Sequence, residues 1–110
     1  MSQSLAKLLT HAVFSTKNRR PLLAPEHRQP LAAYFTGIFK KLESPSIAIE
    51  SVEDHVHILF TLSKNQALAD VMEEVKKGTS KWLKTLSPSL ADFYWQGGYG
   101  AFSASQSNVD

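Results

Sequence analysis

The sequence predicts an α+β fold, in which an antiparallel sheet has two helices packed on it. Two long segments carry apolar residues at helical spacing, and four short segments carry the β-branched and aromatic residues typical of strands. Their order along the chain is strand, helix, strand, strand, helix, strand. The length of 110 residues, with 43% hydrophobic and 20% charged residues, indicates a single domain over residues 1–110 with a buried core.

The first strand is expected in the second half of segment 5–16, LAKLLTHAVFST, which contains neither glycine nor proline. Both faces of this strand are mostly apolar, which favours a central strand that is covered on both sides. A basic segment follows, in which Lys17, Arg19 and Arg20 precede a proline. These cations form either a solvated turn or a loop that contacts phosphate, and the sequence leaves both alternatives open.

A first helix is predicted from Pro25 to Leu42. Both Pro25 and Pro30 lie early in it, where a missing backbone N–H costs least. Segment 44–46, SPS, ends the helix. Apolar residues at helical spacing form the stripe that should face the core: Leu31, Tyr34, Phe35, Ile38 and Leu42.

The second and third strands are expected to form an antiparallel hairpin. Segment 47–52 is the first of the pair, segment 53–54 is the turn, and the run HVHILF begins the second. Side chains alternate between the two faces of a strand, so His55 and His57 share one face. The opposite face, directed to the core, carries Val56, Ile58, Phe60 and Leu62.

A second helix is predicted from about Gln66 to Leu86, although Gly78 weakens its middle. Its apolar stripe consists of Leu68, Val71, Met72, Val75, Trp82 and Leu83. A basic stripe follows another side of the same helix and consists of Lys77, Lys81 and Lys84. This second stripe is either an ordinary solvated face or a surface for phosphates.

The last strand is expected within the aromatic, glycine-punctuated run 93–103, with a bulge or sharp bend. The tail 105–110 is typical of a turn or a helix N-cap. The complete order is the β-α-β-β-α-β pattern of ferredoxin-like and RRM-like folds, in which the first and third strands are central neighbours. His11 should therefore lie close to His55 and His57, on a sheet face that in RNA-recognition domains holds nucleic acid.

Composition excludes several classes of site and partner. The chain has no cysteine, which rules out disulfides and thiolate zinc sites. It has no apolar run near 18 residues and no signal-peptide pattern, so we expect a cytoplasmic protein without a membrane partner. It has no glycine-rich phosphate loop, so no nucleotide cofactor is expected. The net charge of +2 is only mildly basic.

The pair His55 and His57 is the main candidate for chemistry, because neutral imidazole is a common ligand of transition metals. A catalytic metal site usually needs a third ligand, and His11, Glu53 and Asp54 are candidates without a decisive spacing. An ordinary half-buried histidine pair is the more common origin of such a pattern. The residues alone therefore predict a mildly basic domain that could bind a divalent metal.

Three segments in order also resemble one family over nearly the whole chain: FSTKNRRP at 14–21, DHVHILF at 54–60 and WQGGYGAFS at 95–103. The chain is similar to IS200/IS605-type transposases, which are single-tyrosine members of the HUH (His-hydrophobic-His) nuclease superfamily. The resemblance implies a DNA transposase of a bacterial or archaeal insertion sequence, with Mg²⁺ or Mn²⁺ held by His55 and His57. It further implies single-stranded DNA with hairpin ends as the substrate, a 5′-phosphotyrosine intermediate, and a homodimer whose active sites combine both subunits.

The chain departs from the family at the nucleophile. In the family, the catalytic tyrosine and a glutamine ligand lie on a further helix, which would begin about where this chain stops, at Asp110. Tyr34 belongs to the predicted core stripe, and Tyr94 and Tyr99 match the aromatic strand rather than the nucleophile. We therefore expect the nucleophile beyond Asp110, and a 110-residue chain that is truncated before its catalytic helix and inactive alone.

Two hypotheses of different classes remain. The native protein is an active transposase whose catalytic helix is lacking here, or it is a single-stranded DNA-binding or regulatory remnant that dimerises without cutting. A third alternative, a metal-independent RNA-binding domain, predicts a stacking aromatic pair on the central strands, which the sequence lacks. For contacts with DNA, the sequence suggests five cations: Lys17, Arg19, Arg20, Lys77 and Lys81.

Overall fold

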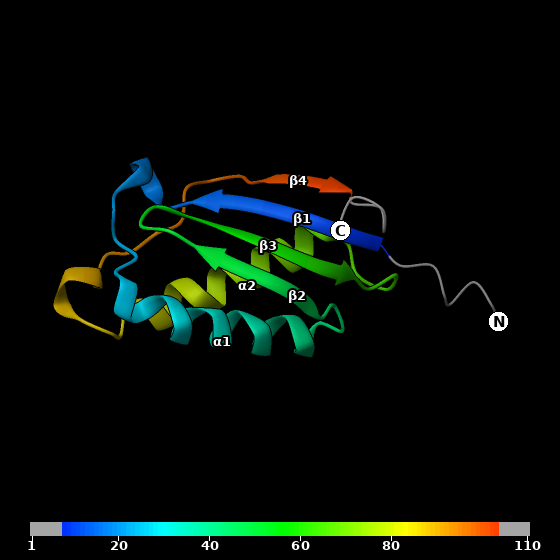
Figure 1. Ribbon diagram of the computed structural model, residues 1–110, viewed down its shortest axis with the longest axis horizontal. Coiled ribbons are helices and arrows are strands. Elements are labelled where there is room, and N and C mark those ends of the chain that lie inside the picture. Colours follow the sequence, from blue (N-terminus) through cyan, green and yellow to red (C-terminus); the bar gives the residue numbers. More distant parts are fainter. Residues whose placement is uncertain (1–7, 104–110) are drawn as a thin grey trace.

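The computed structural model describes residues 8–103 and shows a four-stranded sheet with two long helices (Figure 1). The tail predicted at 105–110 lies outside the described residues. The elements in chain order are β1 (Leu8–Ser15), η2 (Lys17–Arg19), α1 (Pro25–Lys41), β2 (Ser46–Ser51), β3 (His55–Leu62), α2 (Leu68–Leu83), η3 (Pro88–Leu90) and β4 (Gly100–Ser103). The predicted α+β class and the order of strands and helices are confirmed.

The sheet has the strand order β2-β3-β1-β4, and all of its pairs are antiparallel. β2 and β3 form the predicted hairpin, and β1 and β3 are the central pair. Their register places Val13 opposite His57 and Ser15 opposite His55. Ser15 and its partner His55 are forty positions apart in the chain, yet they meet at the centre of the sheet. The same pairing brings the histidines of β1 and β3 close together.

Both helices pack on the same face of the sheet (Figure 1). Alternate residues of β1 and β3, including Phe14 and Phe60, point to the helices, where Phe14 meets Phe35 at 5.9 Å and Phe60 meets Phe39 at 4.7 Å between ring centroids. The expectation that β1 is covered on both sides is wrong. Its other face carries the half-buried His11, because no helix of residues 8–103 covers that side.

The buried stripe of α1 consists of Leu31, Phe35 and Phe39. The prediction that Tyr34 belongs to the core is wrong, since this residue is 40% exposed and stacks on Trp82 of α2 at 5.0 Å. Residues at i, i+4 and i+8 form the stripe that actually faces the sheet. Because Phe35 faces the sheet, the preceding residue Tyr34 lies beside it on the helix and contacts α2 instead.

Gly78 lies where α2 approaches α1. A Cβ atom at this position would lie 2.7 Å from Cδ1 of Ile38, which is too close for two carbon atoms. The residue that weakens the helix in sequence is thus the residue that permits close packing of the helices. The helix itself is shorter than expected, ending at Leu83 rather than Leu86.

The last strand is also shorter than predicted. β4 begins at Gly100, and the segment before it is irregular apart from a bridge between Trp95 and Thr16. Gly98 has a φ of +82°, which disfavours side-chain-bearing residues and interrupts any continuous strand. In the part of the chain that the structure describes, no helix has the length and apolar character needed to cross a bilayer.

Candidate active site

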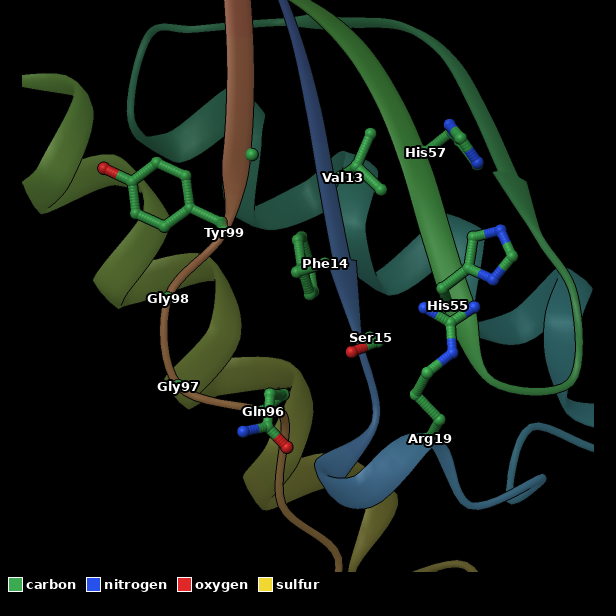
Figure 2. Close-up of a pocket in the computed structure, with 11 residues that line it drawn as sticks. Val13, Phe14, Ser15, Arg19, His55, His57, Gln96, Gly97, Gly98 and Tyr99 are labelled. Atoms are coloured by element: carbon green, nitrogen blue, oxygen red, sulfur yellow. The ribbon is translucent and has the colours of Figure 1, made fainter.

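The two histidines of β3 lie in a hollow on the face of the sheet that the helices leave open (Figure 2). Its volume is about 320 Å³. We call it the histidine hollow, and its lining comes from β1, the following turn, β3 and the segment before β4: Val13, Phe14, Ser15, Arg19, His55, His57, Gln96, Gly97, Gly98, Tyr99 and Gly100. Three regions that are distant in sequence therefore meet around the histidine pair.

The alternation of β3 produces the pair. Val56 and Ile58 are fully buried against the helices, so His55 and His57 project from the opposite face, where both are half-buried. Their ring centroids lie 4.9 Å apart at an interplanar angle of 68°. The predicted approach of His11 is confirmed for His57, with its Nε2 atom 3.4 Å from Nδ1 of that ring.

Asp54 orients the first imidazole. The Nδ1–H of His55 donates to Oδ1 of Asp54 at 2.7 Å, and Nε of Arg19 lies 3.4 Å from Oδ2. The hydrogen bond from His55, assisted by the positive charge of Arg19, holds the pKa of Asp54 below its ordinary value. The carboxylate is therefore ionised. Because it binds the Nδ1–H of His55, Nε2 is the nitrogen of this ring that remains available to bind a metal.

The second imidazole is kept neutral by its surroundings. Burial lowers the pKa of His57, and the neighbouring imidazoles of His55 and His11 lower it further when they are charged. A neutral ring has a lone pair to offer, which a metal ligand requires. The site thus combines one imidazole that is oriented by a carboxylate with one that resists protonation.

The turn after β1 brings Arg19 to the hollow. Asn18 and Arg19 have φ angles of 58° and 54°, in the left-handed region. The backbone N–H of Asn18 donates to Oε1 of Gln96 at 2.8 Å, and Thr16 Oγ1 donates to the carbonyl of Arg20 at 2.7 Å. These bonds support a conformation that is costly for residues with side chains.

Gln96 is a site residue that the sequence prediction missed. Its side chain holds the turn that carries Arg19, and Lys76 of α2 donates to the backbone carbonyls of Gln96 and Gly98 at 2.8 Å each. Burial lowers the pKa of Lys76. In the sequence, Gln96 stands out only as a polar residue within the run WQGGYG. The pattern of neighbouring residues does not indicate that its side chain contacts Asn18.

The donor set fits part of a divalent-metal site. His55 and His57 would hold the ion, and Asp54 and His11 stand behind them, as outer partners commonly do behind metal-binding histidines. Within residues 8–103, no group of three or more His, Asp and Glu side chains is placed to hold a metal. Further ligands would have to come from water, from a phosphate of the substrate or from residues outside this range.

The structure divides the five predicted DNA-binding cations between two places. Arg19 lines the histidine hollow, whereas Lys17 and Arg20 are exposed on the same turn without lining it. Lys77 and Lys81 lie at another hollow of about 380 Å³, which we call the lysine hollow. Its lining consists of Lys76, Lys77, Ser80, Lys81, Lys84, Tyr94 and Trp95.

None of the three tyrosines is placed as a nucleophile beside the histidines. Tyr99 lines the histidine hollow, but Figure 2 shows its ring turned away from His55 and His57. Tyr94 lines the lysine hollow, and Tyr34 stacks against α2 on the helical side of the sheet. Tyr94 and Tyr99 precede β4 instead of lying in the last strand, and the expectation that the nucleophile lies beyond Asp110 stays a prediction.

Comparison with known proteins gives a family and a fold. A family model described as "Transposase IS200 like" matches residues 4–110. A protein from Deinococcus radiodurans R1 assigned as a transposase has a similar structure, with a TM-score of 0.79, 22% identity, and coverage of 93% of this chain and 82% of that one. No curated protein sequence matches.

A second similar structure is a REP-associated tyrosine transposase bound to a REP hairpin. Its TM-score is 0.65 and its sequence identity is 16%, with coverage of 90% of this chain and 57% of that one. At these identities both structures support the fold rather than a shared activity. The role of the histidine hollow therefore rests on the family match and on its own geometry.

Proposed function

Because this chain belongs to the family of IS200-like transposases, we propose that it serves the cleavage and rejoining of single-stranded DNA at the histidine hollow. The observation that carries the proposal is the pair His55 and His57, 4.9 Å apart on the open face of the sheet, with Asp54 behind the first ring. A carboxylate that holds the tautomer of a histidine is a common partner of metal-binding imidazoles. The pair also opens to a hollow large enough for a phosphate.

His55 and His57 would bind Mg²⁺ or Mn²⁺ through their free ring nitrogens. When bound, such an ion would supply charge to polarise the scissile phosphate and to stabilise the charge that develops on its oxygens. Asp54 keeps the ring of His55 in the correct tautomer, and Arg19 adds a positive charge at the edge of the same hollow. Arg19 is thus the best placed of the predicted cations to contact the phosphate that is cut.

The proposed nucleophile is the hydroxyl of a tyrosine outside the described residues, as the family resemblance implies. Its oxygen forms a bond to the phosphorus and loses its proton, while the bond from phosphorus to the 3′ oxygen breaks and that oxygen takes up a proton. The products are a 5′-phosphotyrosine and a free 3′-hydroxyl. The covalent link conserves the energy of the phosphodiester, so rejoining needs no ATP.

The proposed substrate is single-stranded DNA with hairpins near the ends of the mobile element, and the proposed assembly is a homodimer that shares its active sites. A similar structure, a REP-associated tyrosine transposase, is bound to a hairpin, which supports this class of substrate. The alternative is a regulatory remnant that binds single strands without cutting them. The positions of Tyr34, Tyr94 and Tyr99 favour that alternative for the 110-residue chain alone.

Incubation with a hairpin-bearing oligonucleotide and Mn²⁺ tests the proposal. Denaturing gel electrophoresis should show a covalent protein–DNA adduct with a chain extended by the family's catalytic helix, and none with the 110-residue chain. The adduct should disappear in the extended variants H55A and H57A, whereas H27A, which removes a histidine of α1, should retain it. An adduct formed by the 110-residue chain would contradict the assignment of the nucleophile, and adducts with H55A and H57A would contradict the role of the pair.

A further inference from the structure

Tyr94 is an exposed aromatic residue on a rigid support. Its neighbours Phe93 and Trp95 are buried in the core, and Tyr94 itself points outward with 57% of its surface exposed. Trp95 packs edge-to-face on Phe93 at 4.9 Å, and its Nε1–H donates to Oγ1 of Thr79 at 3.0 Å. The buried residues Phe93 and Trp95 thus fix the backbone on both sides of Tyr94 and hold its ring at the surface.

Lysines of α2 and its C-cap residue line the hollow to which this ring belongs. The ammonium group of Lys84 lies 4.3 Å from the ring centroid of Tyr94 and donates to Oγ of Ser80 at 2.9 Å. Lys81 and Lys77 line the same hollow about one and about two turns earlier on the helix, respectively. Over residues 8–103, none of these lysines forms an ion pair with a carboxylate, so their charge is available to an anion.

The lysine hollow is separate from the histidine hollow but adjoins it. The two share no lining residue, and the segment from Gln96 to Gly98 runs between them. Lys76 lines the lysine hollow and donates to the carbonyls of Gln96 and Gly98, whose residues line the histidine hollow. Lys76 thus connects the lining of the lysine hollow to the segment that lines the histidine hollow.

We propose that the lysine hollow binds an unpaired nucleotide of single-stranded DNA, with its base stacked on Tyr94 and its adjoining phosphates on Lys77 and Lys81. An aromatic platform beside cations is the combination by which proteins hold single strands without reading their sequence. The volume of about 380 Å³ lies in the range of about 300–1,000 Å³ of ligand pockets. The inference rests on the proposed function and adds a contact outside the cleavage site.

Fluorescence anisotropy with a labelled oligothymidylate strand and the 110-residue chain tests this site. Y94A should weaken binding on the order of tenfold, whereas Y94F, which keeps the ring, should bind as the native chain does. The double variant K77Q/K81Q should weaken binding and reduce the slope of log K against log salt by about 0.7 for each lysine. The matched control K40Q/K41Q, at the exposed end of α1, should change little.

Two results would overturn the inference. If Y94A binds as tightly as the native chain while K77Q/K81Q binds weakly, the hollow is a purely electrostatic surface, as an acidic protein partner would use. If the native chain does not bind the strand, the hollow is no single-strand site. Both results leave the adduct assay with H55A and H57A unaffected, so failure here is distinguishable from failure of the proposed function.

Discussion

At the scale of single residues, the histidine pair depends on its supporting side chains as much as on the two rings. Asp54 contacts both His55 and Arg19, and it therefore links the proposed metal ligand to the proposed phosphate contact. The sequence predicted the common face of the two histidines from strand alternation alone. It offered Asp54 only as one of several possible ligands, because the distance from a carboxylate to a ring cannot be read from sequence spacing.

Replacement of Asp54 by asparagine should lower the affinity for Mn²⁺ about 10- to 100-fold, because outer partners of metal-binding histidines typically have effects of this size. The side-chain amide of the new asparagine can donate as well as accept a hydrogen bond, so it no longer fixes the proton of His55 on Nδ1. Nε2 is then not kept free to bind the metal. Isothermal titration calorimetry of D54N measures the change. The matched control is E53Q, which alters the neighbouring exposed carboxylate. Equal affinities of D54N and E53Q would show that Asp54 does not orient the ring.

His57 should make the stability of the metal-free protein depend on pH. Its pKa in the folded chain lies below its ordinary value of 6.5, so the unfolded chain binds more protons in the range between the two values. This contribution to stability is complete above about pH 6.5 and is lost as the pH falls through the folded pKa. Urea unfolding in EDTA from about pH 5 to 7.5 should show a flatter profile for H57Q than for H27Q. Parallel profiles of H57Q and the native chain would contradict the prediction.

At the scale of elements, the two helices owe their close contact to one small residue. An alanine at Gly78 would raise helix propensity by about 1 kcal/mol, but its Cβ would meet Cδ1 of Ile38 at 2.7 Å. The clash involves the end of a flexible side chain, which limits its cost without removing it. Sequence reasoning registered Gly78 only as a weakness of α2, since the neighbour that explains it lies on α1.

The variant G78A should therefore gain less than about 1 kcal/mol, or lose stability, in the native background. With I38V, which removes the clashing methyl group, the same substitution should gain close to the full helix-propensity term. A double-mutant cycle from urea denaturation measures this coupling. Additive effects within about 0.3 kcal/mol would show that Gly78 and Ile38 do not restrict one another.

At the scale of the whole molecule, the placement of both helices on one face decides where chemistry can occur. The covered face buries Phe14, Phe35 and Phe60, and the other face presents the histidines of two neighbouring strands. The histidine hollow and the lysine hollow lie on either side of the segment before β4. The molecule thus has two hollows with different chemistry. The histidines of one suit a metal ion, whereas the tyrosine and lysines of the other suit a stacked base and its phosphates.

The sequence by itself determined the order of elements and the faces of β3, because strand alternation and helical spacing are local properties of the chain. It also carried the motifs by which the family is recognised. The tertiary structure decided what local patterns cannot encode: that Gln96 supports Asn18 and that α1 turns Tyr34 away from the core. These contacts follow from sheet order and helix packing, which bring together residues far apart in sequence. His55 and His57 were therefore recognisable from sequence, whereas their supporting residues became identifiable only after folding had brought them together.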